Sequence, residues 1–199
     1  APFVTIWLTH GIHTSRTSRR LADLAPLVEK ASGIKTKYFE YGNLLAVQTR
    51  FWNPGIAERL AKLVEPGDIL VGHSNGVCIS VRALMLGAPA VGLVALNGAL
   101  KNDFDFDSLT PGLTFIHTYY NDDDGAVPWA QRSPKILLDP LWGDLGHAGY
   151  KGTSWKVRQF DCEHTTGMPA LRGHSAILNA PAAEEWAGAW ASRVAAARP

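Results

Sequence analysis

Short apolar runs alternate with longer segments of helical periodicity along most of the chain. The runs expected to form β-strands cover residues 3–9, 35–41, 68–71, 90–97, 112–120 and 155–160. Between them, apolar side chains recur at helical spacing in the segments 18–31, 43–64, 77–84 and 178–194. A continuous apolar run such as 90–97 is typical of a parallel strand that is buried on both faces. The pattern therefore predicts a doubly wound, mostly parallel α/β sheet of about six strands with helices on both faces.

Two helices carry further signals. Asn53-Pro54 predicts an N-cap followed by a proline at the first helical position, which divides the segment 43–64 into two helical pieces. The last helix has apolar residues at every fourth position: Leu178, Ala182, Trp186, Trp190 and Val194. This stripe predicts a terminal helix that packs on the sheet.

The amino-acid composition is typical of a globular protein. Of the 199 residues, 46% are apolar and 19% are charged, so we expect one domain over 1–199 with a sizeable core. The short length leaves little room for an insertion above the sheet, which predicts an open site with a minimal cap. Nineteen basic and eighteen acidic residues give a net charge of +1. This balance does not favour nucleic acid or an anionic membrane as a partner.

The sequence shows no signal peptide and no long apolar span, so a cytoplasmic location is expected. The two cysteines, Cys78 and Cys162, are far apart in sequence, and no disulfide is inferred from them. Cys78 lies among apolar residues and is predicted to pack in the core.

The most specific motif is Gly72-His73-Ser74-Asn75-Gly76, between the predicted strand 68–71 and the predicted helix 77–84. It has the G-x-S-x-G pattern of a nucleophile elbow. The glycines leave space at a sharp strand-to-helix turn where a Cβ would collide with backbone. The motif predicts Ser74 as a nucleophile and the Asn75 N–H, at a helix N-terminus, as an oxyanion donor. The His73 side chain is expected to pack beneath the turn.

A second oxyanion donor is expected after the first strand, which ends in His10-Gly11-Ile12. We assign this role to the Ile12 N–H, and the alternative is that Gly11 only permits a turn at the strand end. His10 and His13 flank the turn and are candidate substrate-binding residues.

The strand ending in His-Gly, the Gly-His-Ser-Asn-Gly elbow, a later acid and a late histidine together resemble the α/β-hydrolase superfamily. The resemblance covers nearly the whole chain and is to a compact, lidless, serine esterase-like member. It implies a catalytic triad in the chain order Ser, then Asp or Glu, then His.

The acid is expected in Asn121-Asp122-Asp123-Asp124, directly after the strand 112–120. Members of the superfamily commonly carry it in an Asp-x-x-Val-Pro setting, which Asp124 matches through Val127-Pro128. Asp122 is the reserve candidate. An acidic surface loop or a weak cation site is the alternative to a catalytic role.

Three histidines follow this acid: His147, His164 and His174. His174 stands after the last predicted strand and just before the last helix, the position that the resemblance implies for the general base. His164 lies closer to the end of the strand and is the alternative, because geometry rather than sequence defines a triad.

The segment 140–152 is dense in glycine and aromatic residues. Its position near the rim of the expected site makes Trp142 and Tyr150 candidate substrate-binding residues, and the alternative is that they cap the sheet edge. The segment is similar to stretches in small hydrolase-like proteins encoded by phages and prophages. Neither H-E-x-x-H nor paired-cysteine spacing occurs, so no metal or other cofactor is expected.

The expected reaction is hydrolysis of a small-molecule carboxylic ester through an acyl-enzyme. The resemblance implies that a serine at the elbow disfavours dehalogenase and epoxide hydrolase chemistry, which the superfamily performs with a carboxylate nucleophile. Amide and thioester hydrolysis use the same triad and stay open. A binding module without catalysis is the alternative from another class of function.

Overall fold

The fold is centred on a six-stranded sheet, seen in a computed structural model that describes residues 4–12, 21–164 and 172–196. The strands are β1 (Thr5–Thr9), β2 (Lys35–Phe39), β3 (Ile69–His73), β4 (Gly92–Leu96), β5 (Phe115–Tyr120) and β6 (Val157–Asp161). Their order is β2-β1-β3-β4-β5-β6, and every neighbouring pair is parallel. The predicted doubly wound parallel sheet is confirmed.

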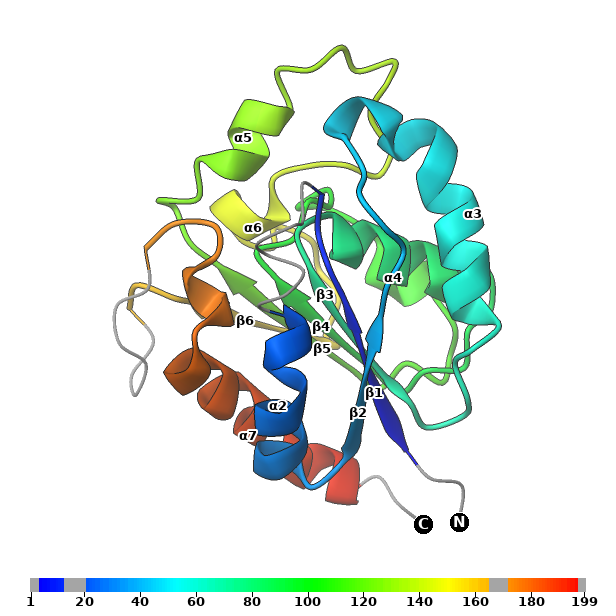
Figure 1. Cartoon of the computed structure of the whole chain (residues 1–199), viewed down its shortest axis with the longest axis vertical. Coiled ribbons are helices and arrows are strands. Elements are labelled where there is room, and N and C mark those ends of the chain that lie inside the picture. The colour runs from blue at the N-terminus through cyan, green and yellow to red at the C-terminus, as the bar shows by residue number, and fades with distance from the viewer. Residues whose placement is uncertain (1–3, 13–20, 165–171, 197–199) are drawn as a thin grey trace.

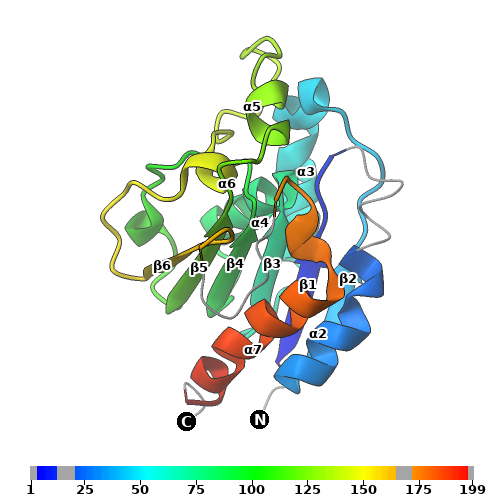
Figure 2. The same ribbon diagram turned by 90° about the vertical axis from the view of Figure 1, so that its left-hand side faces the viewer.

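Helices cover both faces of this sheet (Figures 1 and 2). One face carries α3 (Thr49–Ala61) and α4 (Asn75–Met85), and the other carries α2 (Ala25–Ser32) and α7 (Ala180–Ala196). The shorter elements are η1 (Ala46–Gln48), η2 (Phe106–Ser108), α5 (Ala126–Ala130), α6 (Leu145–Ala148) and η3 (Ala176–Leu178). In the described part of the chain, no helix is long and apolar enough to cross a membrane.

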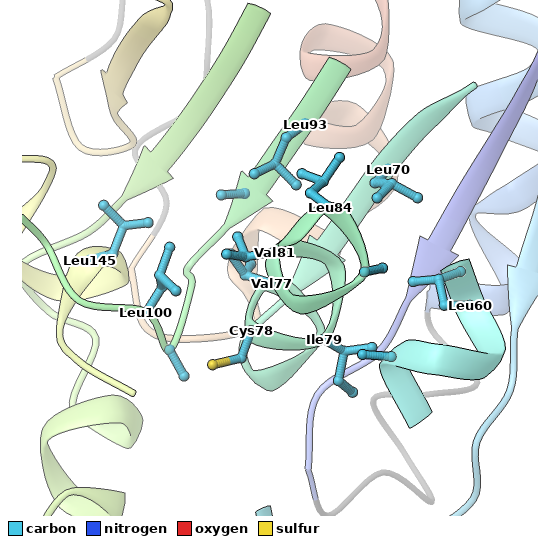
Figure 3. Packing of buried hydrophobic residues seen from close by; sticks show 14 of the residues in the cluster. Leu60, Leu70, Val77, Cys78, Ile79, Val81, Leu84, Leu93, Leu100 and Leu145 are labelled. Atoms are coloured by element: carbon cyan, nitrogen blue, oxygen red, sulfur yellow. The ribbon is translucent and has the colours of Figure 1, made fainter. Parts of the chain in front are cut away.

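The core follows from the alternation of side chains along the strands. Leu70 of β3 packs on one side, among residues of α3 and α4, as Figure 3 shows. Its neighbours Ile69 and Val71 point to the other side, where they join the apolar residues of α2 and α7. Trp186 and Trp190 of α7 are fully buried there, which confirms that the terminal helix packs on the sheet. Cys78 is also fully buried, as predicted, and is a free thiol.

The predicted helix start at Asn53-Pro54 is wrong. Helix α3 begins at Thr49, directly after η1, so both residues lie inside it. Pro54 has no N–H to donate to the carbonyl of Arg50, which is an exposed residue of the first helical turn. Asn53 does not cap the helix because its side chain is buried in tertiary hydrogen bonds that the sequence does not reveal.

The chain winds in two directions from the middle of the sheet. It passes from β1 outward to β2, then returns to β3 beside β1 and continues outward through β4, β5 and β6. In such sheets ligands bind outside the carboxyl ends of the strands where the direction reverses, here between β1 and β3. Helices α5 and α6 lie beyond those ends (Figures 1 and 2).

At the opposite end of the sheet, a buried carboxylate joins β1 to the start of β3. Asp68 is 1% exposed, and its side chain accepts hydrogen bonds from the Thr5 N–H at 2.7 Å, the Trp7 indole N–H at 2.9 Å and the Glu65 N–H at 2.9 Å. Removing the carboxylate would leave all three donors without this partner.

We expect Asp68→Ala to lower the free energy of unfolding by about 2–4 kcal/mol, because buried donors left unsatisfied are costly. Urea unfolding measures this difference. Asp103→Ala, which removes an exposed aspartate, is the matched control and should change the free energy by less than about 0.5 kcal/mol. Equal effects of the two substitutions would contradict the assigned role of Asp68.

Candidate active site

Ser74 occupies the turn between β3 and α4 with a strained backbone. Its φ of 55° and ψ of −122° lie in a region that residues with a Cβ rarely adopt. Three backbone hydrogen bonds hold it there: its N–H donates to the carbonyl of Leu96, and its carbonyl accepts from the N–H groups of Val77 and Ala99. Strain of this kind persists only where surrounding structure fixes it, and it is common at functional sites.

Close packing around the turn explains two of the glycines. A Cβ on Gly76 would collide with the carbonyl of Thr9, so only glycine lets the first turn of α4 approach the end of β1. A Cβ on Gly11 would lie 2.8 Å from the Cβ of Ser74. The loop after β1 is therefore pressed against Ser74, where the sequence predicts an oxyanion donor.

Asp124 and His174 meet beside this turn. His174 donates its Nδ1–H to Oδ2 of Asp124 at 2.7 Å, and Asp124 is completely buried. Oδ1 of Asp124 accepts from the N–H groups of Ala126 at 3.1 Å and Val127 at 3.4 Å, and the Asn97 side chain donates to Oδ2 at 3.3 Å. These donors fix the carboxylate and, through it, the imidazole.

The alternative acid and base lie elsewhere. Asp122 is exposed on the loop after β5. The side chain of His164 is 75% exposed and bonds to Asp161 at 2.9 Å, a contact that raises the pKa of His164. The structure thus brings Asp124 and His174 together and leaves Asp122 and His164 at the surface.

A pocket of about 230 Å³ opens over Ser74. It is lined by Gly11, Ile12, His73, Ser74, Ala99, Ala126, Val127, Trp129, Ala130, Trp142 and His174. Most of these side chains are apolar. Apart from the two histidines, none of them can carry a charge.

The predicted substrate-binding residues divide into three groups. Trp142 lines the pocket. His10 is 1% exposed, and Tyr150 is buried with its hydroxyl bonded to the carbonyl of Phe104. Neither residue lines the pocket, so their positions do not support contact with a substrate. His13 lies outside the described residues.

His73 has a role that the motif alone did not reveal. It lines the pocket, and its Nε2–H donates to the backbone carbonyl of His174 at 2.9 Å. The two rings lie 4.7 Å apart. Burial lowers the pKa of His73 to about 3, so the ring is neutral at pH 7 and can hold the His174 backbone without adding charge to the site.

A buried polar network lies behind the turn. The side-chain amides of Asn53 and Asn75 bond each other in both directions, at 2.9 and 3.0 Å, and the Trp142 indole N–H donates to Asn75 at 2.8 Å. Asn53 also donates to Asp139, whose two carboxylate oxygens accept from Nε–H and Nη2–H of Arg82, each at 2.6 Å. The network joins α3, α4 and the loop that carries Trp142, the one residue of the network that lines the pocket.

In the part of the chain that the structure describes, no group of three or more His, Cys, Asp or Glu residues could hold a metal ion.

Comparison with known proteins finds no matching family model and no matching curated protein. Solved structures do match. Lipase B of Aspergillus fumigatus has a TM-score of 0.59 at 13% identity, with 96% of this chain and 52% of the lipase covered. A putative YdeN-like hydrolase of Pectobacterium atrosepticum has a TM-score of 0.57 at 16% identity, with coverage of 99% and 94%. The esterase domain of a Rhodothermus marinus protein has a TM-score of 0.58 at 12% identity, with coverage of 96% and 88%.

The chain has the α/β-hydrolase fold. In this fold the nucleophile follows a central strand, and the acid and the histidine come later in the chain. Here Ser74 follows β3, Asp124 follows β5 and His174 follows β6. The three side chains thus occur in the chain order typical of α/β-hydrolases.

Two buried histidines predict a loss of stability in acid. Burial lowers the pKa of His73 to about 3 and that of His10 to about 4, whereas an unfolded histidine titrates near pH 6.5. Because both folded-state pKa values are depressed, the unfolded chain binds more protons below about pH 6.5, and stability falls as the pH drops. The two groups together should lower the free energy of unfolding by about 3 kcal/mol between pH 6.5 and 5.

Urea unfolding at several pH values measures this dependence. His73→Gln keeps a donor for the His174 carbonyl but cannot titrate, so it should remove about half of the histidine contribution. The same pH dependence in His73→Gln and wild type would show that His73 is not a buried neutral group.

Proposed function

We propose that the chain is a serine hydrolase that cleaves carboxylic esters through an acyl-enzyme on Ser74. The observation that carries the proposal is the 2.7 Å hydrogen bond between His174 and the buried Asp124, beside a pocket that both His174 and Ser74 line. With Nδ1–H donated to Asp124, the Nε2 of His174 is the nitrogen that accepts a proton.

The reaction begins when Ser74 Oγ attacks the ester carbonyl while His174 takes the hydroxyl proton. The carbonyl oxygen becomes an oxyanion, for which the N–H groups of Ile12 and Asn75 are the proposed donors. The tetrahedral intermediate collapses, and the alcohol leaves with the proton from His174. A water then attacks the acyl-enzyme by the same route, releasing the acid and restoring Ser74.

Asp124 supports this cycle without taking the proton. Its carboxylate keeps His174 in the tautomer whose Nε2 is unprotonated and stabilises the imidazolium that forms. The backbone N–H groups of Ala126 and Val127 and the Asn97 side chain hold that carboxylate in place. This preorganisation is favourable because the groups need not move as charge develops.

The pocket favours an uncharged, apolar acyl group. Ala99, Val127, Ala130 and Trp142 contribute apolar surface beside Ser74. Burying a charged substrate group against these side chains would be costly because nothing there compensates for lost hydration. Esters of short and medium aliphatic acids are therefore the proposed substrates.

Asp124→Asn should lower kcat for p-nitrophenyl butyrate by about ten-thousand-fold, since the amide stabilises the wrong imidazole tautomer. Ser74→Ala should abolish turnover. Asp122→Asn is the matched control two positions away on an exposed part of the same loop, and it should keep wild-type kcat. Steady-state kinetics of the three variants test the proposal.

Loss of activity in Asp122→Asn with retention in Asp124→Asn would contradict the assigned acid. A folded wild type that hydrolyses no ester, thioester or amide would contradict the proposal and favour a binding module.

Filling the pocket should shorten the preferred acyl chain. Ala130 is buried in α5 and lines the pocket, so Ala130→Phe should lower kcat/KM for octanoate esters by at least about tenfold while acetate esters are little affected. Ala189→Phe, at an exposed position of α7, is the control. A uniform loss across the ester series would show that the acyl chain does not occupy this pocket.

A further inference from the structure

The hydroxyl of Tyr41 holds two successive carbonyls in the loop beside the nucleophile. Its Oη lies 2.8 Å from the carbonyl oxygen of His10 and 2.8 Å from that of Gly11, so one hydroxyl proton is shared between them. The Gly11 carbonyl also accepts the Nδ1–H of His10 at 2.7 Å. The His10 ring stacks on Tyr41 with centroids 3.8 Å apart and planes 8° apart.

These contacts with the Gly11 carbonyl fix the direction of the Ile12 N–H. In a trans peptide the C=O and N–H bonds point in opposite directions, and the described residues contain no cis bond. Fixing the Gly11 carbonyl therefore fixes the N–H of Ile12. Gly11 packs against Ser74, and Ile12 lines the pocket, so this N–H belongs to the peptide that borders the nucleophile.

The Tyr41 hydroxyl stays protonated in this setting. Burial raises the pKa of Tyr41 well above its usual value, so the phenol keeps its proton and can donate it to the two carbonyls.

We propose that Tyr41 is a positioning residue that aligns the Ile12 N–H for a developing oxyanion. This inference rests on the proposed function, because the oxyanion it concerns is the one formed when Ser74 attacks an ester. Tyr41 does not line the pocket, so it acts through the Gly11–Ile12 peptide rather than by touching the substrate. It also gives His10 a role, which is to donate a second hydrogen bond to the Gly11 carbonyl.

Tyr41→Phe tests the inference because it keeps the ring stacked on His10 and removes only the hydroxyl. We expect kcat for p-nitrophenyl butyrate to fall by about 10- to 100-fold, less than or similar to the loss of an oxyanion donor itself. KM should stay within about twofold, since the lost interaction matters mainly in the transition state.

An aliphatic trifluoromethyl ketone gives a second readout. Attack of Ser74 Oγ on its carbonyl carbon forms a tetrahedral hemiketal with the oxyanion in place, so its affinity follows transition-state stabilisation. Tyr41→Phe should weaken its inhibition by the same factor as kcat/KM. The thermal midpoint should fall by less than about 5 °C. Tyr119→Phe, a buried tyrosine on the opposite face of the sheet, is the control and should match wild type in kcat and inhibition.

Each outcome is decisive. Wild-type kcat and inhibitor affinity in Tyr41→Phe overturn the inference alone, as does a rise in KM with unchanged kcat. Equal losses in Tyr41→Phe and Tyr119→Phe indicate general loosening and also overturn it. A wild type that neither hydrolyses esters nor binds the ketone overturns the proposed function and this inference with it.

Discussion

The close approach of the first turn of α4 to the end of β1 is the constraint on which the site depends. Gly76 touches the carbonyl of Thr9, and Gly11 touches Ser74, with no space for a Cβ at either contact. This packing brings the loop after β1 against Ser74, whose positive φ is held by its backbone hydrogen bonds. Backbone packing thus places the proposed nucleophile next to the Gly11–Ile12 peptide, and the Tyr41 hydroxyl holds that peptide in its orientation.

The rest of the proposed machinery follows from the parallel sheet. Because all strands run in one direction, the loops after β3, β5 and β6 leave the same edge, and Ser74, Asp124 and His174 converge there. Between the nucleophile and the acid, Asn97 at the end of β4 has a φ of 44° and donates to Asp124. The two non-glycine residues with positive φ among the described residues, Ser74 and Asn97, therefore both belong to this edge.

Local patterns in the sequence predict the fold and much of the candidate site. Strand and helix periods predict the parallel sheet, and the elbow motif places Ser74 at its turn. The Asp-x-x-Val-Pro setting favours Asp124, and the structure shows this carboxylate, not that of Asp122, against His174. These features could be predicted because each depends on neighbours within a few positions.

The features that the sequence does not predict depend on distant partners. The sequence predicts Asn53 as a helix cap, but its side chain is hydrogen-bonded to Asn75 and Asp139, which are 22 and 86 positions away. The sequence makes His10 a candidate substrate-binding residue, but in the structure its ring stacks on Tyr41. Single polar residues of this kind have no periodicity, so only the tertiary structure shows what they bond.

The most direct test of the account is labelling with a fluorophosphonate, which reacts with an activated serine. The modified peptide is mapped by mass spectrometry in wild type and in Ser74→Ala. We expect stoichiometric labelling of wild type on Ser74 and none in Ser74→Ala. A folded wild type that is not labelled, or is labelled on another serine, would contradict the claim that Ser74 is the nucleophile.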